Sequence, residues 1–400
     1  MSTQLQYTQR GSRDFNAILF ALFLAGFAIF SSLYCVQPMM PFVAEYYGIS
    51  AAQSSLPLSV STIALAVGLL FSGIVSDQIG RKPMMLLALL LSSILLIVIS
   101  LFHHWTLFLV LRIFVGLSVS GVAAVTMTYI GEEIAKEDIG FAMGLYISGT
   151  AIGGMGGRLI AGLALDYMQW YQVILLIGIL NLCIAGLFYL YLPASKHFTA
   201  TKIRFNFVIR SLYKALHNQV LVTLFILGFI LMGCFVSVFN YISYHLLHAP
   251  FNLSQSLIGL ISLAYLSGIY SSPQAAIWAT KIGRYKVIVR MLCLMLLGLG
   301  LMLFQQIYLL LIGLLLFTFA FFAAHATASS WVSSHSVQAG AMGSSLYLFC
   351  YYLGSSVLGS GSGMIWQSTS WSGLITFLSI FIFAALLCTQ RLKKVMLQSV

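Results

Sequence analysis

The chain has 400 residues, of which 60% are hydrophobic and only 7% are charged, and its mean hydropathy is +1.01. Soluble domains carry roughly 25% charged residues, so this chain cannot cover a water-facing surface and is expected in the lipid bilayer. The net charge of +11 comes from short basic clusters between long apolar runs, with no basic groove or stripe. This pattern excludes a nucleic-acid partner.

Twelve apolar runs follow one another along the chain, each close to the roughly 20 residues that a membrane-spanning helix needs. The longest polar stretch, residues 193–218, separates the sixth run from the seventh. The predicted fold is therefore an all-α polytopic membrane protein with 12 transmembrane helices. Two six-helix bundles, residues 1–192 and 219–400, are joined by a basic linker. The runs lie at 16–38, 54–76, 83–102, 106–130, 140–165, 171–192, 219–245, 256–278, 287–305, 307–332, 340–364 and 372–389.

The basic residues predict the orientation of the chain in the membrane. Seventeen of the 19 Lys and Arg residues lie at the N-terminus, in alternate loops, in the linker or in the tail, all of which fall on one side. Cytoplasmic loops carry an excess of Lys and Arg. We therefore expect both termini and the linker to be cytoplasmic.

The two halves of the sequence resemble each other. Residues 73–83 read GIVSDQIGRKP, and residues 276–286, displaced by 203 positions (276 minus 73), read AIWATKIGRYK. The Ala-Met-Gly triplet at 142–144 recurs at 341–343, displaced by 199 positions (341 minus 142). A duplicated six-helix unit suggests alternating access, with a substrate site between the halves near the bilayer midplane.

The sequence resembles the major facilitator superfamily over essentially its whole length. The most specific element is the pattern Gly73-x3-Asp77-x2-Gly80-Arg81-Lys82, which is similar to the family's signature in the loop between helices two and three. The resemblance implies that these five residues form a gating motif. Asp77 lies opposite Arg81 and Lys82, so we expect a charge pair that holds the second and third runs together on the cytoplasmic side. In the family, the aspartate also faces the N-terminus of helix eleven, where the helix dipole favours a negative charge.

Further patterns extend the resemblance. Arg112-x3-Gly116 is similar to the family's arginine pattern in helix four, and residues 33–38 and 344–349 are most similar to drug–proton antiporter-like proteins of bacterial inner membranes. The resemblance implies two pseudo-symmetric bundles that move a substrate by alternating access. It also implies a multi-pass protein of the bacterial cytoplasmic membrane.

A glycine-rich segment is similar to the motif of the proton-coupled antiporters. Gly149, Gly153 and Gly157 recur at every fourth position, which predicts a small-residue face for close helix packing. The sequence departs from the motif where Gly154 replaces the usual proline and Arg158 replaces the closing glycine.

Ionisable residues are scarce inside the runs. No Asp or Glu occurs after residue 166, and no carboxylate lies deep in any run, although multidrug exporters of cations in this family usually carry one. Arg112 and Arg158 do lie inside runs, and a guanidinium suits a carboxylate or phosphate. Their alternative roles are structural: snorkelling, pairing with backbone carbonyls, or pairing with Asp166.

His325 is the only ionisable side chain deep in the second half, and it is a candidate proton carrier because of its pKa range. Glu132 and Glu133 are the other carrier candidates, and a structural hydrogen bond is the alternative role for the histidine. Polar and aromatic residues inside the runs are substrate-binding candidates beside the two arginines, or else packing residues: Tyr34, Gln37, Tyr146, Asn240, Tyr241, Tyr265, Tyr347 and Tyr351. Pro38, Pro41 and Pro273 are candidate hinges.

The sequence favours transport over other functions. It contains no catalytic constellation and no metal-ligand spacing, its six cysteines stand singly inside apolar runs, and no cofactor is expected. A channel lacks support because no pore loop or charge ring is seen. We expect a monomeric transporter that couples to protons and exports a small molecule with anionic groups. Uptake of an organic acid or of a carboxylate chelator such as a siderophore, export of cationic drugs, and a non-transporting receptor remain alternatives.

Overall fold

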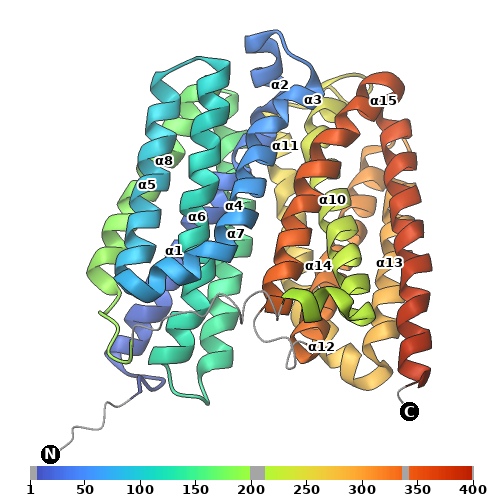
Figure 1. Ribbon diagram of the computed structural model, residues 1–400. Helices are drawn as coiled ribbons and strands as arrows, with labels where there is room; N and C mark the ends of the chain where they lie inside the picture. Colours follow the sequence, from blue (N-terminus) through green and yellow to red (C-terminus); the bar gives the residue numbers. More distant parts are fainter. Residues whose placement is uncertain (1–6, 199–211, 336–341, 399–400) are drawn as a thin grey trace, which may run out of the picture. The chain divides into compact units, whose positions relative to one another are not determined.

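The computed structural model describes residues 7–198, 212–335 and 342–398, and these form helices joined by short connections (Figure 1). In the first half the helices are α1 (Arg13–Tyr34), α2 (Val36–Tyr47), α3 (Ala51–Ser54), α4 (Leu56–Ile79), α5 (Arg81–Leu101), α6 (Trp105–Glu133), α7 (Ile139–Leu165) and α8 (Trp170–Tyr191). In the second half they are α10 (Gln219–Leu247), α11 (Gln255–Leu260), the 3-10 turn η1 (Ile261–Ala264), α12 (Tyr265–Ile282), α13 (Arg284–Leu301), α14 (Ile307–His335) and α15 (Met342–Gln398).

Every predicted apolar run overlaps one of these helices. The last two runs share α15, which changes direction at Ser370, where φ is 58° and ψ is −158°. Among the described residues, nine helices are long and apolar enough to cross a membrane. The all-α fold is confirmed, whereas the count of twelve spans stays a prediction.

The chain divides into two compact units. The first comprises residues 1–39 and 63–203, and the second comprises residues 40–62 and 204–400. Residues 40–62 therefore pack with the second unit, although they fall within the predicted 1–192 bundle. Part of the predicted linker, with Lys202, Arg204 and Arg210, lies outside the described residues.

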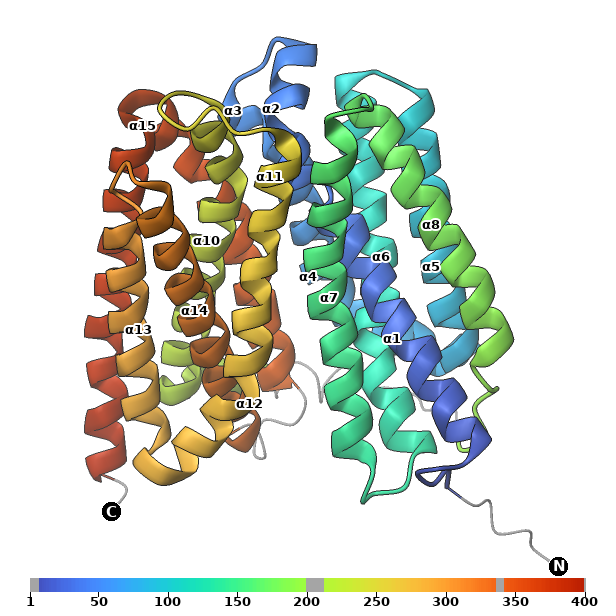
Figure 2. The same ribbon diagram turned by 180° about the vertical axis from the view of Figure 1, so that it is seen from behind.

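In the first unit α1 packs against α7 and α8, and α5 packs against α6 and α8 (Figure 2). The three glycines expected on a packing face lie against the α1 backbone. A Cβ added to Gly149 would sit 2.5 Å from the Phe23 carbonyl oxygen, and one added to Gly153 would sit 2.4 Å from that of Phe27. One on Gly157 would reach the α1 backbone in the same way. The small residues thus let α1 and α7 approach closely.

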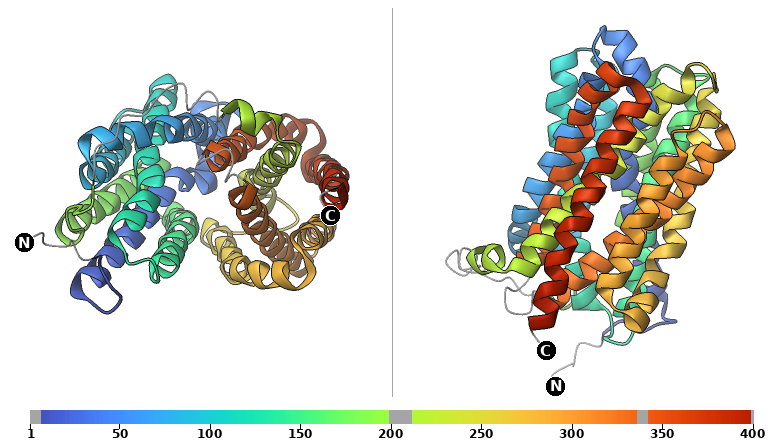
Figure 3. Two further views of the ribbon diagram at one scale, coloured as in Figure 1. Left: turned by 60° about the horizontal axis from the view of Figure 1, so that its bottom comes forward. Right: turned by 90° about the vertical axis from the view of Figure 1, so that its right-hand side faces the viewer.

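In the second unit α10 lies against both α15 and α14, and α14 packs on α12 and α13 (Figure 3). Gly354 of α15 lies against the α10 backbone, because a Cβ added to Gly354 would sit 2.0 Å from the Phe229 carbonyl oxygen. Gly153 of α7 lies against Phe27 of α1 in the same way. The two units therefore repeat one close helix contact, displaced by 201 residues for the glycines (354 minus 153).

The repeated sequence segments adopt the same turn. Gly80 ends α4 and precedes α5 with φ of 95°, and Gly283 ends α12 and precedes α13 with φ of 87°. These positive φ values strain any residue with a Cβ. An arginine opens the next helix in both cases, at Arg81 and at Arg284.

The first apolar run is interrupted between α1 and α2. Pro38 has no N–H, so the carbonyl four residues earlier, that of Tyr34, loses its helical partner. The helix α1 ends at Tyr34, and α2 begins at Val36. Pro41 and Pro273, the other expected hinges, lie inside α2 and α12, which continue through them.

Candidate functional site

Arg112 of α6 holds the end of α1. Its side chain is fully buried, and its Nη1 and Nη2 donate to the carbonyls of Ser32 and Leu33 at 2.7 and 2.9 Å. The last carbonyls of a helix lack intrahelical partners and carry a partial negative charge, which a guanidinium stabilises. Arg112 thus occupies the C-terminus of α1 beside its break.

Arg158 of α7 reaches the same break from the other side. Only 2% exposed, it donates from Nε to the Gln37 side chain at 2.5 Å and from Nη1 to the Gly154 carbonyl at 2.6 Å. Its guanidinium also lies over the Tyr34 ring, 4.3 Å from the centroid, in a cation–π contact. The first unit therefore gathers four of the expected substrate residues, Tyr34, Gln37, Arg112 and Arg158, around the α1–α2 break.

Asn181 of α8 is a polar residue of this region that the sequence analysis did not select. Its Nδ2 donates to the Ala28 carbonyl at 3.1 Å and to the Ser32 hydroxyl at 2.8 Å. The Ser31 hydroxyl donates to its Oδ1. A lone asparagine in an otherwise apolar run was the available signal. Asn181 fixes the last turns of α1 that present their carbonyls to Arg112.

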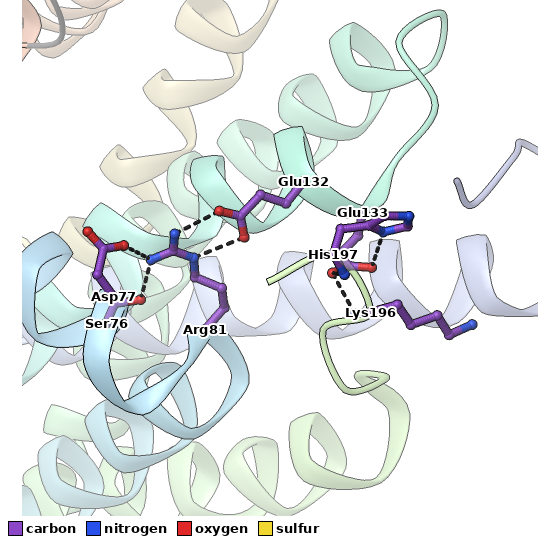
Figure 4. A network of polar contacts seen from close by, with 7 residues as sticks. All are labelled: Ser76, Asp77, Arg81, Glu132, Glu133, Lys196 and His197. Atoms are coloured by element: carbon purple, nitrogen blue, oxygen red, sulfur yellow. Dashed lines mark hydrogen bonds and ion pairs between the residues drawn. The ribbon is translucent and has the colours of Figure 1, made fainter. Parts of the chain in front are cut away.

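A charged network joins the ends of α4, α5 and α6 (Figure 4). Arg81 pairs with Asp77 through Nη1 and with Glu132 through two bonds, Nε to Oε2 at 3.0 Å and Nη2 to Oε1 at 2.7 Å. Its Nη1 also donates to Ser76. The expected Asp77–Arg81 pair is thus present. Glu132, expected as a proton carrier, is the main partner of the arginine.

Lys82, expected to lie opposite Asp77 as a charge partner, contacts α8 instead. Its Nζ donates to the carbonyls of Tyr189 and Leu192 at the end of α8, rather than pairing with Asp77. Gly73, the first motif residue, lies within α4 with open space beside its Cα. The motif residues therefore tie α4, α5, α6 and α8 together at one end of the first unit.

Glu133 forms a second cluster beside this network (Figure 4). The side chain accepts from the backbone N–H groups of Lys196 and His197 at 2.7 and 2.9 Å, and its Oε2 lies 3.1 Å from His197 Nδ1. Tyr7 stacks on the His197 ring at 4.5 Å. Glu133 thus anchors the segment that follows α8. The sequence alone could not show this contact, because its partners are far apart in the chain.

In the second unit, three expected residues meet between α14 and α15. The Nδ1 atom of His325 lies 3.0 Å from the Tyr347 hydroxyl, and the His325 ring lies 4.4 Å from that of Tyr351. Phe321 is parallel to the imidazole within 9°. Tyr265 packs nearby against Phe235, with 5.4 Å between ring centroids. We call the rings of this group the aromatic cluster: Phe235, Tyr265, Phe321, His325, Tyr347 and Tyr351.

The remaining substrate candidates are engaged in packing contacts. Asn240 and Tyr241 both donate to the Gly359 carbonyl at 3.0 Å and so link α10 to α15. Tyr146 of α7 is buried, with 3% of its surface exposed. In the described part of the chain, no group of three or more His, Cys, Asp or Glu side chains is placed to hold a metal ion.

Comparison with known proteins gives consistent matches. Residues 22–359 match the profile of the Major Facilitator Superfamily. The chain is 45% identical to the inner membrane transport protein YnfM of Escherichia coli over 389 residues, which cover 97% of this chain and 93% of that protein. It is 42% identical to an uncharacterised transporter of Buchnera aphidicola over 96% of this chain and 94% of that protein. A bacterial homologue of the human lysosomal transporter Spinster superposes with a TM-score of 0.78 at 11% identity, covering 96% and 98% of the two chains.

Proposed function

Because the chain belongs to the major facilitator superfamily and is a membrane transporter rather than an enzyme, we propose that it exports a small organic solute with an anionic group in exchange for protons. The arginines at the α1–α2 break carry this proposal. Two cations are buried there, with exposed fractions of 0% for Arg112 and 2% for Arg158. Four of their hydrogen bonds go to neutral oxygens, those of Ser32, Leu33, Gln37 and Gly154.

Two buried guanidinium groups are costly to keep in a membrane. Each costs about 2.5–3.5 kcal/mol on insertion scales, so residues of this kind are functional candidates. Arg112 is compensated by the carbonyl end of α1. Arg158, held by an amide, a carbonyl and a ring, is the better candidate for receiving a solute carboxylate, with Tyr34 and Gln37 beside it.

In this proposal the transport cycle is alternating access by two six-helix bundles, residues 1–192 and 219–400. The chain acts as a monomer, and both of its termini lie in the cytoplasm. The glycine pattern of α7 favours export, because it is similar to that of the proton-coupled antiporters. Glu132 is the proposed proton carrier. Release from Arg81 would let its carboxylate take up a proton.

Thermal unfolding of the purified protein in detergent tests the solute class. Benzoate, benzamide and tetraphenylphosphonium supply an anion, a neutral analogue of the same shape and a lipophilic cation. A ligand that binds the folded state raises Tm by mass action. We expect benzoate to raise Tm in the wild type, benzamide to raise it less, and Arg158→Gln to lose the benzoate effect.

Three other results would contradict the proposal. Stabilisation by tetraphenylphosphonium that survives Arg158→Gln and Arg112→Gln would favour a cationic drug exporter. Benzoate binding without exchange across proteoliposomes would favour a receptor. Import of external benzoate driven by an inward proton gradient would show that the protein takes up its solute instead of exporting it.

A further inference from the structure

Tyr347 and His325 form a polar pair within the aromatic cluster. Tyr347 is buried, with 1% of its surface exposed, and its hydroxyl lies 3.0 Å from His325 Nδ1. Within the described part of the chain, this is the only hydrogen bond of that hydroxyl. The phenolic proton therefore has one acceptor, the lone pair of Nδ1.

This contact determines which imidazole nitrogen carries the proton. If Nδ1 were protonated, it would donate to the phenol oxygen, and the buried phenolic proton would have no acceptor among the described residues. A buried donor without an acceptor destabilises the folded protein. The neutral imidazole therefore accepts at Nδ1 and carries its hydrogen on Nε2.

The surrounding residues hold this pair in place. Gly228 of α10 leaves room for the phenol, because a Cβ there would lie 2.7 Å from Tyr347 Cε2. The ring centroids of Tyr351 and Phe321 lie 4.4 and 6.1 Å from that of the imidazole. His325 is itself half-buried, and its Nε2 makes no hydrogen bond to the residues that the structure describes. A donor is thus fixed in orientation and has no hydrogen-bond partner among the described residues.

We propose that His325 Nε2–H donates to an acceptor oxygen, carboxylate or carbonyl, of the transported solute. Tyr347 is a positioning residue that sets the tautomer. The inference rests on the proposed transport function, and it assigns His325 to solute recognition instead of the proton carriage expected from sequence.

Two amide substitutions separate the two ring nitrogens. The amide nitrogen of His325→Gln reaches the position of Nε2 and can still donate to the solute. The amide of His325→Asn reaches only the position of Nδ1, so it can satisfy Tyr347 but not the solute. A hydrogen bond to a charged group contributes about 1.5–3 kcal/mol, so His325→Asn should weaken benzoate binding on the order of 10- to 100-fold.

The benzoate concentration for half-maximal stabilisation is the measured quantity. We expect a change within about threefold for His325→Gln. His335→Gln, an exposed histidine on the same helix, is the matched control and should not change it. Equal losses in the Asn and Gln variants would overturn the donor role. A Gln variant that binds benzoate normally but no longer couples transport to a pH gradient would overturn the assignment of His325 to recognition instead of proton carriage.

The tautomer is tested without any ligand. Nitrogen-15 NMR of protein labelled at its eight histidines, compared with the His325→Gln spectrum, identifies the two His325 signals. We expect a protonated Nε2 and an unprotonated Nδ1 in the wild type, and a mixture in Tyr347→Phe. A protonated Nδ1 in the wild type refutes the inference even if benzoate is transported. A protonated Nε2 with no benzoate binding instead counts against the proposed solute class.

Discussion

Arg81 of α5 and Glu132 of α6 meet in a two-armed ion pair, with 3.0 Å between Nε and Oε2 and 2.7 Å between Nη2 and Oε1. The arginine side chain is 6% exposed and the glutamate 25%. The parallel geometry of the two hydrogen bonds gives this contact more energy and specificity than an ordinary surface pair. It joins two residues that are 51 positions apart in the sequence, one at the start of α5 and the other at the end of α6.

Replacing Glu132 by Gln should therefore lower the thermal stability of the protein. The amide cannot accept both guanidinium bonds, and it leaves the largely buried Arg81 with Asp77 as its remaining carboxylate partner. We expect a loss of about 1.5–3 kcal/mol, seen as a lower Tm in detergent. Glu137→Gln, at an exposed position just beyond α6, is the control and should leave Tm unchanged. Equal Tm values for the two variants would contradict a stabilising pair.

Asp77→Asn should reduce transport without preventing membrane insertion. Arg81 keeps Glu132 and Ser76, so the first unit retains its fold, but the ionic link from the end of α4 is lost. Benzoate exchange in proteoliposomes measures the effect, and the amount of protein in the membrane fraction provides the control. Unchanged exchange would argue against a gating role for the motif.

Gly153→Ala should destabilise the α1–α7 contact. The new methyl group would lie 2.4 Å from the Phe27 carbonyl oxygen, and a backbone atom can move away only if the whole helix shifts. Overpacking of this kind costs about 1–3 kcal/mol. Gly144→Ala on the same helix meets nothing within 4 Å and is the matched control. A similar Tm for both variants would show that the helices tolerate the added volume.

Arg112→Lys should lower Tm even though it keeps the positive charge. A lysine ammonium cannot reproduce the planar fork that holds the Ser32 and Leu33 carbonyls together. Losing these charge-assisted bonds is expected to cost on the order of 3 kcal/mol. Since Arg112 is proposed to hold α1, added benzoate should still raise the Tm of this variant. A variant as stable as the wild type would mean that the α1 end is held by other residues.

The sequence predicted the helices well because a membrane helix depends on the length of a local run of apolar residues. It also predicted the Asp77–Arg81 pair, whose members lie four residues apart across one turn. The break in the first run was expected near Pro38, but the helix ends at Tyr34, because proline removes the partner of a carbonyl one turn earlier.

The partners of the buried groups depend on tertiary packing and could not be read from a single sequence. Arg112 and Arg158 were both selected, but nothing in their spacing shows that one takes backbone carbonyls and the other Gln37. Glu133 and His197 are 64 residues apart, and no periodicity connects them. Asp166, a possible arginine partner, ends α7 as its C-cap residue.

The two glycine turns at Gly80 and Gly283 share a backbone, but their arginines bind different partners. Arg81 binds two carboxylates, whereas Arg284 donates to the Ser334 hydroxyl at 2.7 Å, and the chain has no Asp or Glu after residue 166. Added salt weakens contacts between opposite charges more than hydrogen bonds between a cation and a hydroxyl. The duplicated turns therefore differ in their response to conditions. Added salt should loosen the Arg81 turn more than the Arg284 turn.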